Sequence, residues 1–176
     1  VMKEKLLRSN RKYHQKTESL WQEMAGISED RLNRKPADGG WSAMQTAWHL
    51  LLVEENSLRY VQKKLGFDDT FEKTGIKTAW RSFLLFAALY MPLKFKAPKA
   101  ASGDHFPEGS SMKELRERWT DVRTSWTDFL SNLPEDLLDK AVYKHPRVGK
   151  IGWVQMMDFL HVHFDRHLLQ IRKAML

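Results

Sequence analysis

The sequence predicts an all-α protein that folds as a four-helix bundle with a long crossover connection between the second and third helices. Four segments carry apolar residues at helical spacing, and the connection from residue 67 to residue 110 is far longer than a tight helix hairpin needs. Seven Trp and nine Phe stand against only nine Gly and six Pro, which is typical of a helical core and not of a β-sandwich. With 176 residues, the chain suits a single domain covering residues 1–176.

The first two long helices are bounded by clear end signals. The first is predicted from Met2 to Met24, where Ala25-Gly26 ends it. The second follows Ser42, a suitable N-cap, and Gln45 stands three residues later as a capping box requires. This helix is predicted to run to Leu65 and is apolar on most sides, which indicates a central position.

The connection between the second and third long helices contains a predicted shorter helix from Thr78 to Tyr90, which Pro92 ends. The apolar run Phe83–Leu93 has about half of the ~20 residues needed to span a bilayer. We therefore expect no membrane contact, and interpret the run as a buried helix or as the surface of a homodimer, with a segment lying on a membrane as the less favoured alternative. The sequence assigns no role to residues 67–110 as a whole.

The third long helix follows Ser111, with Glu114 placed for a second capping box. Its apolar residues follow the alternating spacing of a bundle seam: Leu115, Trp119, Val122, Trp126, Phe129 and Leu133. Pro134 closes it, and residues 135–138 are predicted to form one helical turn. The fourth helix is predicted to begin near Gly152-Trp153 and to run almost to residue 176.

Composition excludes several classes of site. The chain has no cysteine, which removes disulfides, thiolate nucleophiles and cysteine-rich zinc sites. The first residues lack the apolar stretch of a signal peptide, and we expect a cytoplasmic protein. The net charge of +7 comes from scattered basic residues without a recognised nucleic-acid-binding motif, so nucleic acid is not expected as a partner.

Three histidines lie close together in the fourth helix. His163 and His167 are four residues apart, which places them about 40° apart on a helix, one turn above the other. Such a pair can direct two imidazoles at one ion. His161 lies about 160° from His163, so it is not expected to join them. The alternative is that the pair comprises a hydrogen-bonded core histidine and a histidine at the rim.

A third ligand is expected from the second helix. His49 lies about 10 Å from the start of that helix, and His167 lies at a similar distance from the end of the fourth. Antiparallel packing of the two helices would bring His49, His163 and His167 level. The remaining histidines, His14, His105 and His145, lie in surface-type sequence and have no such support.

Three imidazoles leave coordination positions open, as catalytic metal sites do. The expected cofactor is a divalent ion, zinc or nickel first and iron or manganese second, because imidazole suits several metals. Asn56 and Gln170 are candidates for hydrogen bonds to ligands or substrate, with an ordinary helix-rim amide as the alternative. Paired Glu-x-x-His motifs, a phosphate-binding glycine loop and a nucleophile elbow are missing from the sequence.

These motifs together resemble the DinB-like superfamily of small bacterial four-helix bundles. The resemblance rests on Trp41-Ser42 shortly before His49, and on the late His163-x-x-x-His167 followed by Gln170 and Ile171. It implies a metal on His49, His163 and His167. Members of this superfamily include damage-inducible proteins, metal-dependent hydrolases and thiol-dependent transferases.

The expected function is that of a metal-dependent enzyme, a hydrolase or a thiol transferase, acting on a small molecule with a low-molecular-weight thiol as a candidate partner. Trp41, Trp153 and Gln170 are candidates for pocket walls, and no catalytic residue is identified. The alternative is a non-catalytic stress-response or interaction module in which the histidine cluster is structural or vestigial.

Overall fold

The computed structural model describes residues 1–67, 71–90, 106–107, 109–145 and 148–176, with side chains for all of these except 85–90. Four long helices dominate the described chain: α1 (Met2–Ala25), α3 (Ala43–Phe67), α5 (Met112–Ser131) and α6 (Trp153–Met175). Their bounds lie close to the predicted ones. The prediction of an all-α protein is confirmed.

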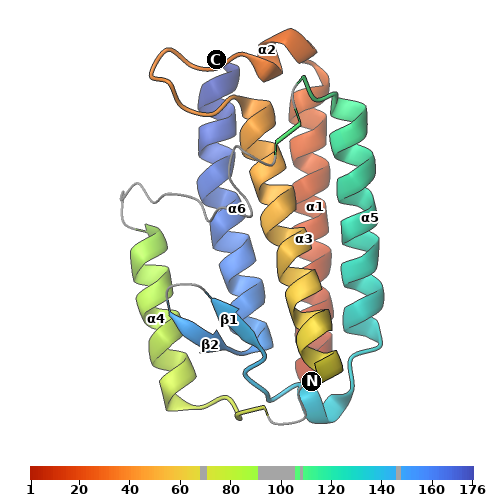
Figure 1. Ribbon diagram of the computed structural model, residues 1–176, viewed down its shortest axis with the longest axis vertical. Helices are drawn as coiled ribbons and strands as arrows, with labels where there is room; N and C mark the ends of the chain where they lie inside the picture. The colour runs from red at the N-terminus through yellow and green to blue at the C-terminus, as the bar shows by residue number, and fades with distance from the viewer. Residues whose placement is uncertain (68–70, 91–105, 108, 146–147) are drawn as a thin grey trace.

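The four long helices stand side by side in one bundle (Figure 1). Figure 1 shows α1 and α6 running in one direction and α3 and α5 in the other. Helix α3 packs against both α5 and α6, and so does α1. The pair α3 and α6 is therefore antiparallel, whereas α3 and α5 are parallel. A long connection between α3 and α5 allows this arrangement, because the chain must return along the bundle before α5 begins.

The start of α3 is held by the predicted capping box. Ser42 Oγ accepts a hydrogen bond of 3.0 Å from the Gln45 N–H, and the Ser42 N–H donates to Gln45 Oε1 over 3.1 Å. An N-cap of this kind contributes about 1 kcal/mol to stability. The box sets where α3 begins, about two turns before His49.

Two small elements were not predicted. A short helix, α2 (Glu29–Asn33), follows Ser28, whose hydroxyl accepts from the Arg31 N–H. The strands β1 (Tyr143–His145) and β2 (Gly149–Ile151) form an antiparallel hairpin. Strands of three residues are too short for alternating apolar and polar residues to reveal them in a sequence. They form here because the two strands hydrogen-bond to each other. The predicted turn near residue 135 is present as a 3-10 turn, Glu135–Leu137.

The predicted seam on α5 is buried. Leu115, Trp119 and Trp126 are fully enclosed, and Phe129 is partly buried at the edge of the core. The same face of α5 also carries a buried cation, because Arg123 is only 3% exposed. Its guanidinium meets the carboxylate of Glu54, which is fully buried on α3. The core is therefore not purely apolar, which the spacing of apolar residues did not reveal.

Helix α4 (Ile76–Tyr90) stands outside the four-helix bundle, beside α6 and the hairpin (Figure 1). The interpretation of Phe83–Leu93 as a buried helix is wrong for its described side chains, since Phe83 is 60% and Leu84 45% exposed. Residues 91–93 lie outside the described part. No helix in the described ranges is both long and apolar enough to cross a membrane.

Candidate metal centre

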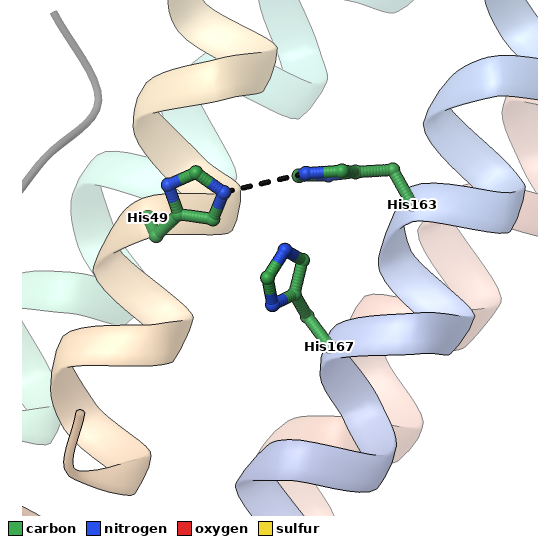
Figure 2. Close-up of side chains that lie close together, drawn as sticks. All are labelled: His49, His163 and His167. Carbon is green, nitrogen blue, oxygen red and sulfur yellow. Dashed lines mark hydrogen bonds between the residues drawn. The ribbon is translucent and has the colours of Figure 1, made fainter. Parts of the chain in front are cut away.

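The antiparallel packing of α3 against α6 brings three histidines together. His49 projects from α3, and His163 and His167 project from successive turns of α6 toward it (Figure 2). One nitrogen from each ring can be chosen so that all three lie within 4.8 Å of one another. In the part of the chain that the structure describes, this is the one group of three or more His, Asp or Glu side chains with metal-site spacing.

The spacing of the nitrogens suits a single ion. His49 Nε2 and His163 Nε2 are 3.3 Å apart. Two imidazole nitrogens bound to one tetrahedral ion at about 2.0–2.1 Å would be separated by about 3.3 Å. The His167 ring lies 4.7 Å from the His49 ring and 4.5 Å from the His163 ring, measured between centroids. The three imidazoles therefore lie close enough together to suit a shared metal.

Gln170 sets the orientation of the most exposed ring of the three. His167 Nδ1 lies 2.7 Å from Gln170 Oε1. An amide oxygen accepts only, so Nδ1 carries the hydrogen and Nε2 presents its lone pair. Metal-binding histidines commonly use their second nitrogen in this way. The predicted role of Gln170 as a hydrogen-bond partner of a ligand therefore has a contact to support it.

Burial keeps the two α6 imidazoles neutral. Burial, reinforced by His167 and His49 nearby, lowers the pKa of His163 well below the ordinary value. Burial, with His49 as the next cause, lowers the pKa of His167 to about 4. Both rings are therefore uncharged at neutral pH, the form in which imidazole binds a metal.

His161 is directed away from the cluster, as helix geometry predicted. Its Nε2 lies 3.1 Å from both the hydroxyl and the carbonyl oxygen of Ser9 on α1. Its ring packs edge-on against Tyr13, with centroids 5.3 Å apart. The three histidines of α6 are thus divided between two faces, and His161 serves the contact between α1 and α6.

Aromatic rings lie around the cluster. The Trp41 ring is 5.1 Å from the His49 ring and 5.2 Å from Phe106, and Phe159 lies 5.4 Å from His163. The expectation that Trp41 forms a wall of the site thus agrees with its position. The expectation for Trp153 is wrong: it is buried ten residues before His163 on α6, and its indole donates to the Leu137 carbonyl.

His145 was wrongly placed with the surface histidines. It is 7% exposed on β1 and packs against Phe159, with ring centroids 4.7 Å apart. It also contributes to the lowered pKa of His163. Tyr143 and His145 are buried and Lys144 between them is exposed, which is the alternation of a strand with one buried face. An alternation over three residues is too short to predict a strand, and so the burial of His145 was missed.

The other predicted residues lie apart from the cluster or outside the description. His14 is exposed on α1, and His105 falls outside the described residues. Asn56 is half-buried on α3, two turns beyond His49, or about 10 Å along the helix. Its contact with a ligand or substrate stays a prediction.

Comparison with known proteins agrees with this arrangement. The family model of the DinB superfamily matches residues 12–171. The protein YuaE of Bacillus subtilis (strain 168), which is itself uncharacterized, is 28% identical over 154 residues, covering 87% of this chain and 88% of that protein. No solved structure matches the chain. Because the family match spans nearly the whole sequence, the chain belongs to the DinB superfamily.

Proposed function

We propose that this protein binds one divalent metal ion on His49, His163 and His167 and uses it to act on a small molecule. The observation that carries the proposal is the meeting of three imidazoles from two antiparallel helices within 4.8 Å. Membership of a metal-associated superfamily supports the same reading. Imidazole ligands suit zinc or nickel first, and iron or manganese are alternatives.

The proposed reaction is a hydrolysis or the transfer of a group to a low-molecular-weight thiol. A divalent ion on three histidines would supply Lewis acidity, which lowers the pKa of water or of a thiol. Gln170 would hold the His167 ring in its binding tautomer. Trp41 and Phe106 would shield the His49 side of the site from bulk water, which strengthens electrostatic effects there.

A non-catalytic interaction module is the second candidate. The observation that favours it is the exposed apolar face of α4, where Ile76 is 91% and Trp80 61% exposed. In this case the metal would tie α3 to α6 and the protein would act through its surface. If the histidine cluster is vestigial, this candidate needs no metal, so metal uptake and activity together separate the two candidates.

Metal uptake tests the proposal directly. The purified protein, stripped with a chelator and dialysed against zinc or nickel, is expected to take up about one equivalent per chain. The loaded protein is then assayed for hydrolysis of activated esters and for thiol addition to small electrophiles. Activity that disappears with the chelator and returns with metal supports the enzyme. Absence of stoichiometric uptake contradicts the metal-dependent enzyme, and uptake without activity favours the interaction module.

Replacing Gln170 tests the orientation of His167. The Gln170→Leu variant keeps all three imidazoles but removes the acceptor for His167 Nδ1. Loss of such a partner typically lowers metal affinity by about 10- to 100-fold. Competition with a chromophoric chelator measures this change, and Gln170→Glu, which restores an acceptor, is the matched control. Equal affinity in the Leu variant would mean that Gln170 is an ordinary rim amide.

A further inference from the structure

Helix α4 carries its apolar face outward. Ile76, Trp80, Phe83 and Leu84 recur at the spacing of a single helix face, and all four are exposed, at 91%, 61%, 60% and 45%. The Trp80 and Phe83 rings stack on one another, with centroids 5.6 Å apart. A contiguous exposed patch of this kind marks an interaction surface.

At the described positions, the face of α4 that turns inward is polar. Thr78 and Ser82 are 4% and 5% exposed, and their hydroxyls donate to the backbone oxygens of Gly75 and Thr78. Arg81 donates to the carbonyl of Lys150 on β2, which joins α4 to the hairpin. The hydrogen bond from Arg81 to the hairpin therefore holds α4 in this orientation, and turning the helix to bury its apolar residues would break that bond.

Positive charge is concentrated in the sequence of α4 and its flanks. The sequence from Lys73 to Gly103 holds six cations and no acidic residue: Lys73, Lys77, Arg81, Lys94, Lys96 and Lys99. The last three lie outside the described residues, so the cations described on and beside α4 are Lys73, Lys77 and Arg81. Since the chain's net charge is +7, this segment carries all but one unit of it. Lys77 is exposed on α4, and the Lys73 side chain just before it is 75% exposed and lies 3.7 Å from the carboxylate of Asp139. Glu72, the acidic residue before the segment, already pairs with Lys150.

We propose that α4 docks on the surface of an anionic lipid bilayer. Apolar and aromatic side chains on one face with basic residues around them are the features of a helix that lies in the membrane interface. Tryptophan favours the headgroup level, and each basic residue near an anionic surface adds to the attraction. The helix would lie on the membrane without crossing it, since 15 residues extend only about 22 Å.

A second copy of the chain fits this face less well. A symmetric dimer would bring the same patch of each subunit together. The exposed Lys77 and Lys73 of one copy would then approach the same cations of the other copy, which costs binding free energy. An anionic surface complements the charge. The earlier expectation of no membrane contact rested on the length of the apolar run, and an interfacial helix does not need that length.

Vesicle sedimentation tests this proposal without reference to the metal site. The full-length protein is mixed with vesicles of phosphatidylcholine alone or with added phosphatidylglycerol, at low and at physiological salt. Binding is expected on the anionic vesicles and is expected to weaken with salt. Trp80→Ser is expected to lower partitioning on the order of 10-fold, and Lys77→Glu by at least about 5-fold.

Lys113→Glu is the matched control for charge. It makes the same change in net charge at an 83% exposed side chain on α5, on the far side of the bundle from α4 (Figure 1). It is expected to keep most of the binding of the native protein. Circular dichroism checks that each variant is folded, and metal uptake of all three variants is expected to equal that of the native protein.

Three results would overturn the proposal. One is failure to bind anionic vesicles, and another is equal binding to neutral and anionic vesicles. The third is a dimer in analytical ultracentrifugation that Trp80→Ser dissociates, which would assign the face to a second copy of the chain. If Trp80→Ser fails to fold, vesicle binding of Lys77→Glu is compared with that of Lys113→Glu. Equal binding of these two variants would also overturn the proposal.

Discussion

Alanine at His49, His163 or His167 is expected to abolish stoichiometric metal binding, whereas alanine at His161 is expected to leave it intact. Each of the three contributes one nitrogen to a cluster with no further His, Asp or Glu ligand among the described residues. Removing a partner of a ligand already costs about 10- to 100-fold in affinity, so removing a ligand is expected to cost at least about 100-fold.

His161→Ala is the matched control because it lies on the same helix, two residues before His163. It removes the contact with Ser9 on α1 and leaves the three-histidine cluster unchanged. Each variant loses one imidazole, so a difference in bound metal between them arises from where the histidine lies and not from the number of histidines. Elemental analysis after dialysis measures bound metal directly.

Thermal unfolding supplies a second readout. An ion that binds only the folded chain stabilises it by about 2.7 kcal/mol at a hundredfold excess over the dissociation constant. The native protein and His161→Ala are therefore expected to melt at a higher temperature with metal than without. The three cluster variants are expected to show no such shift. Retained binding in any of them would remove that histidine from the set of ligands.

Glu54→Ala is expected to destabilise the fold by about 3–5 kcal/mol, because it leaves the guanidinium of Arg123 buried without its counter-ion. Glu54 is fully buried and Arg123 is 3% exposed. The Glu54 carboxylate also accepts a 2.6 Å hydrogen bond from the Trp119 indole. Arg123 in turn donates to Asn10 on α1, so the loss affects three helices. Urea denaturation measures the change in the free energy of unfolding.

The Arg123→Leu substitution is expected to lower the free energy of unfolding less at low pH than at neutral pH. Burial raises the pKa of Glu54, although Arg123 opposes that shift. Without Arg123 the carboxyl can take up a proton and become neutral, so the deficit of Arg123→Leu should shrink as the pH falls. The deficit of Glu54→Ala should not shrink in this way, because the guanidinium keeps its charge.

An exposed ion pair provides the control for the effect of Glu54→Ala on stability. Lys113 and Glu117 on α5 are 3.9 Å apart and largely exposed. Glu117→Ala is expected to change stability by no more than about 0.5 kcal/mol. A double substitution, Glu54→Leu with Arg123→Met, is expected to cost less than the sum of the single changes. Equal effects of Glu54→Ala and Glu117→Ala would show that the buried pair is not needed for the fold.

Local sequence was sufficient for the helices and for much of the cluster. The spacing of apolar residues located the four long helices, and the capping motifs at Ser42 and Ser111 marked where two of them begin. The four-residue interval between His163 and His167 placed both on one face and turned His161 to another. These features were predictable because a helix repeats with a known angle, so position along the chain determines direction around it.

Tertiary packing decided the features that depend on distant neighbours. The height of His49 against α6 follows from antiparallel packing, and the burial of Glu54 follows from a cation on another helix. His145 became buried through a hairpin too short to read, and α4 turned its apolar face outward. Periodicity shows that a helix has an apolar face, but the surrounding chain determines whether that face is covered. This is why the sequence alone predicted the composition of the histidine cluster but did not decide between a buried and an exposed apolar face on α4.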